Sequence, residues 1–311
     1  MSRTVFLGTS DFAAIVLRRL SESPHRPQLV LTPPDSRRGR GRRELPPPAA
    51  AVARELDLPL AQVQSVNAPD VLERIRSSSP ETAVVCAFGQ LIREPLLSEL
   101  QMLNLHPSLL PRWRGAAPIE RAIMAGDKET GVCIMRVTEG LDSGPVALCE
   151  RTAIERGEDF GSLTARLAEL GGKLIVRALD LAQEGELEFS EQDEAQVTYA
   201  EKIESSERLL QPTLPAPQLE RVVRALNPHV GAYLQLQEGE RLGVRAASAE
   251  DGDVSPGALQ ARDGTLRLGC GEGVLRLEVV QPPGGRPMPA DAYVRGHQVP
   301  DRVIVQNDRH G

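Results

Sequence analysis

The sequence lacks the features of a membrane or exported protein. No run approaches the roughly 18 consecutive apolar residues of a membrane span, and the chain opens on a strand-like pattern instead of the apolar stretch of a signal peptide. The four cysteines (Cys86, Cys133, Cys149, Cys270) are far apart, and no two form a Cys-x-x-Cys pair. We therefore expect a cytoplasmic protein with reduced, buried thiols, and a disulfide or metal site as the alternative.

Aromatic residues and lysines are also scarce. Five Phe, three Tyr and one Trp in 311 residues leave a core built mainly of Leu, Val, Ile and Ala.

The net charge of −7 argues against a protein that coats nucleic acid through a basic surface. One segment differs from this average, because Arg37–Arg43 contains five arginines in seven residues. The length itself predicts two domains.

Two cofactor patterns are missing as well. Gly8-Thr-Ser-Asp11 follows the first strand-like run and is not the Gly-x-Gly-x-x-Gly of a dinucleotide-binding turn. No group of His, Cys and carboxylate residues has the spacing of metal ligands, so we expect neither a nicotinamide cofactor nor a metal.

Alternating strand and helix patterns fill the first part of the chain. They predict an α/β domain with a Rossmann-like parallel sheet. The expected strands are 4–7, 29–32, 82–87, 102–106, 131–137 and 146–152, and the expected helices are 12–20, 49–58, 69–77, 94–100, 118–125 and 162–184.

The texture changes after residue 185. A polar stretch, 186–211, is expected to be a linker on the surface. Beyond it, one helix (219–226) and five short strands (232–236, 243–247, 258–262, 265–268 and 275–280) predict a small antiparallel, OB-like β-barrel. We expect a catalytic domain at 1–188, a linker at 189–206 and a C-terminal domain at 207–311.

Three polar residues form a candidate site. Asn104 and His106 lie two apart in a strand-like run, so both project from the same face. Asp142 follows in Gly140-Leu-Asp-Ser-Gly144. If they meet, an amide, an imidazole and a carboxylate supply the groups of an acyl-transfer site. Taken singly, each also fits a structural role: a satisfied core Asn, a buried His and an Asp that caps a turn.

The longer motif resembles the folate-dependent formyltransferase family. The resemblance rests on Asn-Leu-His-Pro-Ser-Leu-Leu-Pro-Arg-Trp-Arg-Gly-Ala-Ala-Pro-Ile, which starts at Asn104, followed by Gly-Leu-Asp-Ser-Gly. It implies 10-formyltetrahydrofolate as co-substrate, no metal, and Asn104, His106 and Asp142 as the catalytic residues. The folate contacts that it implies are Ser108, Leu109, Leu110, Pro111, Phe88, Gly89, Leu91 and Gly140.

The resemblance extends along most of the chain and points to the family members that formylate initiator methionyl-tRNA. It is carried by Phe6–Ala13, Pro34–Arg43, Thr198–Lys202 and Arg224–Pro228. It implies initiator methionyl-tRNA as a partner and no membrane, and we expect a monomer. The residues implied in contacts with the tRNA acceptor stem are Arg37, Arg38, Arg40, Arg42 and Arg43.

Alternatives remain open at this stage. The same chemistry serves glycinamide ribonucleotide or an amino-sugar nucleotide, and an RNA-binding protein can keep such a fold without catalysis. The arginine segment is either a phosphate-binding arm or a solvated segment. Trp113, with Arg112 and Arg114, either walls a channel for the aminoacyl end or serves packing. The sequence departs from the family at Phe88, where Tyr is usual, and at His229, where Trp is usual.

Overall fold

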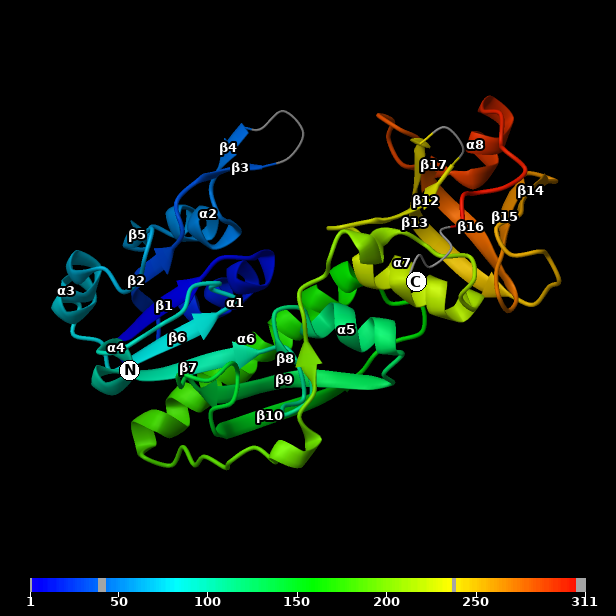
Figure 1. Cartoon of the computed structure of the whole chain (residues 1–311). Helices are drawn as coiled ribbons and strands as arrows, with labels where there is room; N and C mark the ends of the chain where they lie inside the picture. Colours follow the sequence, from blue (N-terminus) through cyan, green and yellow to red (C-terminus); the bar gives the residue numbers. More distant parts are fainter. Residues whose placement is uncertain (1, 39–42, 237–238, 306–311) are drawn as a thin grey trace, which may run out of the picture. The chain divides into compact units, whose positions relative to one another are not determined.

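The computed structural model of the chain describes residues 2–38, 43–236 and 239–305 (Figure 1). These residues form two compact units. Unit 1 contains the residues up to Pro118, Glu129–Ala153 and Thr164–Ala200. Unit 2 contains Ile119–Lys128, Ile154–Leu163 and the described residues from Glu201 onward. The two units thus alternate along the chain, whereas the domains expected from the sequence were contiguous. Those domain bounds remain predictions.

Unit 1 is built on a seven-stranded sheet with the order β10-β9-β7-β6-β1-β2-β5 (Figure 1). The strands β5, β2, β1, β6 and β7 are parallel. In contrast, β9 is antiparallel to both β7 and β10. The Rossmann-like α/β architecture is confirmed, with two antiparallel strands added at one edge. The strands are β1 (Thr4–Gly8), β2 (Pro27–Thr32), β5 (Leu60–Gln62), β6 (Thr82–Cys86), β7 (Gln101–His106), β9 (Glu129–Arg136) and β10 (Val146–Ala153).

Helices cover both faces of this sheet. On one face, a Cβ atom at Gly171 of α6 would come within 2.7 Å of the Leu105 side chain, so the glycine lets the helix pack closely on β7. On the other face, Val71 and Ile75 of α3 join the core with Leu7 of β1. The helices are α1 (Asp11–Ser21), α2 (Pro48–Glu55), α3 (Pro69–Ser77), α4 (Leu96–Glu99) and α6 (Phe160–Glu184). In the described part of the chain, no helix is long and apolar enough to cross a membrane.

The arginine-rich segment has a paired base. Strands β3 (Ser36–Arg38) and β4 (Arg43–Leu45) form an antiparallel pair that the sequence analysis did not predict. Arg37, which is exposed, lies opposite Glu44. Such a pair of opposite charges favours this register. Arg40 and Arg42 lie outside the described residues.

Unit 2 contains an antiparallel sheet with the order β12-β13-β16-β15-β14, and β17 pairs with β16. Residues 301–304 connect its two outer strands, because Leu259 of β14 donates to Asp301 and Ile304 donates to Gln235 of β12. The antiparallel C-terminal fold is thus confirmed. Its strands are β12 (Ala232–Gln235), β13 (Arg241–Glu250), β14 (Leu259–Arg262), β15 (Thr265–Gly269), β16 (Val274–Gln281) and β17 (Met288–Pro289).

Three helical segments pack in unit 2 as well. They are α5 (Pro118–Ala125), α7 (Ala216–Leu226) and α8 (Ala290–Gly296). Arg121 of α5 forms an ion pair with Glu207, and this hydrogen bond lowers the pKa of the Glu207 carboxyl. His229 stacks on Phe160 at a centroid distance of 3.7 Å and faces Glu120 of α5. The position where the family usually has Trp is therefore filled by another flat ring.

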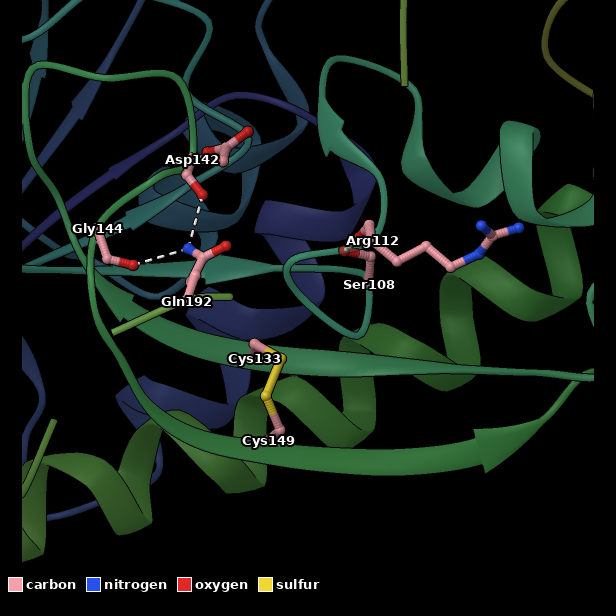
Figure 2. The surroundings of a disulfide bond; sticks show 7 residues. All are labelled: Ser108, Arg112, Cys133, Asp142, Gly144, Cys149 and Gln192. Atoms are coloured by element: carbon pink, nitrogen blue, oxygen red, sulfur yellow. Dashed lines mark hydrogen bonds between the residues drawn. A yellow bond between two sulfur atoms is a disulfide. The ribbon is translucent and has the colours of Figure 1, made fainter. Parts of the chain in front are cut away.

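The expectation of four reduced thiols is wrong for one pair. Cys133 of β9 and Cys149 of β10 lie directly opposite each other in the strand register and form a disulfide (Figure 2). Their separation of 16 residues gave no sign of this, because the pairing depends on how the two strands align. Cys86 and Cys270 are free and buried, as expected.

Candidate active site

A pocket of about 620 Å³ lies in unit 1. Four segments line it: the residues that follow β6, the end of β7, the loop between β9 and β10, and the segment that contains Gly115, Ala116 and Pro118. Leu91 and Leu141 are 61% and 63% exposed there, which is unusual for large apolar side chains and typical of a ligand-binding surface. Of the predicted site residues, the lining includes Asn104, His106, Asp142, Phe88, Gly89, Leu91 and Gly140.

The structure brings the three predicted catalytic residues together. Asn104 Nδ2 donates to Asp142 Oδ1 over 3.3 Å, and Asp142 Oδ2 lies 3.6 Å from His106 Nδ1. The His106 side chain is 5% exposed and that of Asp142 is 17% exposed, so water screens this contact only weakly. Both β7 residues project from one face of the strand, as their spacing predicted.

Main-chain groups of a neighbouring segment complete the contacts. His106 Nε2 lies 2.9 Å from the carbonyl oxygen of Trp113, and Asp142 Oδ2 accepts from the Gly115 amide over 2.9 Å. A carbonyl oxygen only accepts, so His106 Nε2 carries the hydrogen of this bond. Nδ1, on the side of Asp142, is therefore the ring nitrogen left to exchange a proton.

Asp142 reaches the site from an unexpected direction. It follows β9, which is antiparallel to β7, so the end of β9 lies beside the start of β7. The loop must then fold back toward His106. Asp142 has φ +47°, a left-handed conformation that few residues other than glycine adopt. Gly144 allows a close approach, since a Cβ atom there would lie 1.9 Å from the Arg136 carbonyl oxygen.

Four predicted folate contacts lie outside the pocket lining. Ser108 is fully buried, and its hydroxyl donates to the Arg112 carbonyl over 2.6 Å. Leu109 lies against Gly131 of β9, where a Cβ atom would come within 2.5 Å of the leucine side chain. Leu110 and Pro111 follow in the same turn. For these four residues, contact with folate remains a prediction.

Sequence reasoning missed several residues that support the site. The carbonyl of Trp113 and the amide of Gly115 left no trace in the side-chain pattern, because any residue carries these groups. Arg114 was considered as a channel wall, but it is 2% exposed and its guanidinium binds Gln192 and Glu194. It therefore lies inside unit 1 instead of facing a channel.

The described residues contain no group of three or more His, Cys, Asp or Glu side chains placed to hold a metal ion.

Comparison with known families identifies the class of enzyme. Residues 2–179 match the family model described as formyl transferase. Residues 202–298 match the model of the formyl transferase C-terminal domain. The first match alone covers more than half of the chain, and it contains the whole Asn104, His106 and Asp142 set. The chain belongs to the formyl transferase family.

Full-length relatives narrow this class. A methionyl-tRNA formyltransferase of Methylobacillus flagellatus is 40% identical over 312 residues, which cover 99% of each chain. One from Halorhodospira halophila is 42% identical over 309 residues, covering 98% of this chain and 99% of the relative. Within the family, the chain belongs with the methionyl-tRNA formyltransferases.

A solved structure shares the fold at lower identity. HypX from Aquifex aeolicus, crystallised in complex with tetrahydrofolic acid, superposes with a TM-score of 0.64 at 17% identity. The alignment covers 98% of this chain and 51% of that chain.

Proposed function

We propose that this enzyme transfers the formyl group of 10-formyltetrahydrofolate to the α-amino group of methionyl initiator tRNA. The observation that carries the proposal is the meeting of Asn104, His106 and Asp142 at one pocket, in a chain whose relatives of that name align over nearly its full length. Because charged initiator tRNA is used in translation, this function would place the protein in the cytoplasm.

The three side chains match the needs of the reaction. The amine nitrogen bonds to the formyl carbon, and the bond from that carbon to N10 breaks. The amine loses a proton and N10 gains one. One hydrogen of the Asn104 amide is directed to Asp142, which leaves the other for the negative oxygen of the tetrahedral intermediate. His106 Nδ1 and Asp142 are the pair suited to proton transfer, directly or through water.

The pocket supports folate as co-substrate. Phe88, Gly89, Leu91 and Gly140 line it and combine apolar surface with main-chain groups, which suits a flat heterocycle with polar edges. Because Ser108–Pro111 lie outside the pocket lining, we expect them to contact a part of the folate that extends beyond this pocket.

The choice of acceptor rests on two other parts of the chain. The C-terminal family match adds a second folded unit to the catalytic one. Arg37, Arg38, Arg40, Arg42 and Arg43 concentrate positive charge in a chain of net charge −7. Such a segment suits the phosphates of a tRNA acceptor stem. Both features favour tRNA over glycinamide ribonucleotide or an amino-sugar nucleotide.

One assay tests the proposal. Formyl transfer from 10-formyltetrahydrofolate should be fast to charged initiator tRNA and slow to free methionine or glycinamide ribonucleotide. Equal rates with free methionine and with methionyl-tRNA would refute the proposed acceptor.

The variant Asp142→Ala tests the role of this carboxylate. It should lose steady-state turnover and remain folded by circular dichroism, and a fully active variant would refute the role of Asp142.

A further inference from the structure

We propose that Gln192 is a positioning residue, which holds Asp142 in its working orientation, and that the buried Arg114 fixes Gln192 in turn. The proposal rests on the proposed function for the reaction that Asp142 serves. Gln192 lies in residues 180–201, between the two family matches, and within the polar stretch 186–211 that was expected to be a surface linker. Its contacts give it a different role.

The side-chain amide of Gln192 holds the Asp142 loop by two hydrogen bonds. Nε2 donates to the carbonyl oxygen of Asp142 over 2.8 Å and to that of Gly144 over 2.7 Å (Figure 2). The two bonds use both amide hydrogens and lie on either side of Ser143. They therefore fix the main chain of the catalytic carboxylate itself.

Arg114 determines which way this amide points. Its Nε donates to Gln192 Oε1 over 3.0 Å, and its Nη2 donates to Glu194 Oε1 over 2.7 Å. Since the guanidinium can only donate, the oxygen of Gln192 must face Arg114 and the nitrogen must face the loop. The neighbouring main chain is paired as well, because Arg114 belongs to β8 (Arg114–Gly115), which pairs with β11 (Tyr199–Ala200).

The same short segment touches the reacting side chains. The carbonyl of Trp113 accepts from His106, and the amide of Gly115 donates to Asp142. Arg114 lies between these two residues. Gln192 thus links the segment that holds His106 to the loop that supplies Asp142.

The loop needs such a link for two physical reasons. It enters from the antiparallel strand β9 and has to fold back, and Asp142 has a positive φ. A residue keeps such a conformation only when its surroundings hold it there. Without Gln192, the loop can relax and move the carboxylate away from His106.

Formyl-transfer kinetics of three variants test the proposal. Gln192→Ala removes the amide, Gln192→Met keeps the length of the side chain without its hydrogen bonds, and Gln196→Ala is the matched control. Gln196 lies four residues later in the same stretch, is exposed, and bonds only locally to Asp193. We expect kcat to fall about 10- to 100-fold in both Gln192 variants, with KM for folate close to wild type. Gln196→Ala should match the wild type.

A double-mutant cycle separates positioning from general damage. In an Asp142→Asn background, measured by single turnover, Gln192→Ala should cause little further loss, because the carboxylate that it positions is already absent. Equal fold losses in both backgrounds would overturn the proposal. So would wild-type kcat in the Gln192 variants.

A measurement without substrate distinguishes this proposal from the proposed function. The Gly115 amide, which is bonded to Asp142, should exchange its hydrogen faster in Gln192→Met than in the wild type, and at the wild-type rate in Gln196→Ala. If the wild type forms no formyl-tRNA but this difference is seen, the acceptor assignment fails and the positioning role stands. Unchanged exchange overturns the positioning role.

Discussion

Opening the Cys133–Cys149 disulfide should destabilise unit 1 without unfolding it. The bond joins residues 16 apart, so it removes conformational entropy from the unfolded chain. For a closed loop of this length, the chain-entropy relation gives a contribution of about 3 kcal/mol at 25 °C. Cys149 is exposed, and a reductant can therefore reach the bond in the folded protein.

Urea unfolding in the presence and absence of a reductant measures this contribution. Trp113 is the single tryptophan of the chain and lies in unit 1, so its fluorescence follows that unit. We expect the free energy of unfolding to fall by about 3 kcal/mol when the bond is reduced. The double variant Cys133→Ser, Cys149→Ser should behave like the reduced protein and should not respond to the reductant.

Two results would refute this reasoning. The first is an unchanged free energy of unfolding in a protein whose disulfide has been shown to open, because thiol titration counts two thiols before reduction and four after it. The second is a protein that titrates four thiols from the start. The thiols should be counted in denaturant, because Cys86 and Cys270 are buried in the folded state and burial raises the pKa of Cys270 to about 11.

Three further predictions concern separate parts of the molecule. In Gly144→Ala, the added Cβ atom would strike the carbonyl oxygen of Arg136 and displace the loop that carries Asp142. We expect kcat for formyl transfer to fall about 10- to 100-fold, and a wild-type kcat would contradict the close approach. The double variant Arg40→Ala, Arg42→Ala should raise KM for tRNA. The slope of the logarithm of tRNA affinity against the logarithm of salt concentration should become shallower by about two, because each lost phosphate contact removes about one unit. An unchanged slope would exclude a role of these arginines in tRNA binding. Glu207, whose pKa is lowered by Arg121, stabilises the fold above the unfolded pKa of roughly 4.3, and this contribution is lost as the pH falls through the lower folded value. Glu207→Gln should therefore lose less stability than the wild type as the pH is lowered from roughly 5, through the range in which a carboxyl group titrates. Unfolding at a series of pH values measures this, and identical curves of unfolding free energy against pH would contradict it.

The sequence was most informative where a local pattern determines the structure. The i, i+2 spacing of Asn104 and His106 correctly predicted that both side chains share one face of β7, since a strand alternates regardless of its neighbours. Most strands and helices of unit 1 were also found close to their actual positions, but the three-residue edge strand β5 was not predicted. Each depends on a hydrophobic period that can be read within a few residues.

The sequence was least informative where strands from distant parts of the chain meet. The direction of β9 relative to β7 left no local sign, so the reversed path of the Asp142 loop was not anticipated. The Cys133–Cys149 bond depends on the register of the same strands. Gln192 lies in a polar stretch whose sequence resembles that of any solvated linker. Its role becomes visible only in the structure, where its side-chain amide donates to two carbonyl oxygens.

The interleaving of the two units limits how acceptor preference can change. A fragment that starts at Glu201 would lose helix α5, and with it the partner of Glu207 and the partner of His229. The C-terminal unit is therefore not a module that gene fusion can exchange at a single cut in the chain. In this lineage, we expect new acceptors to arise by substitution within a retained scaffold and not by replacement of the whole unit.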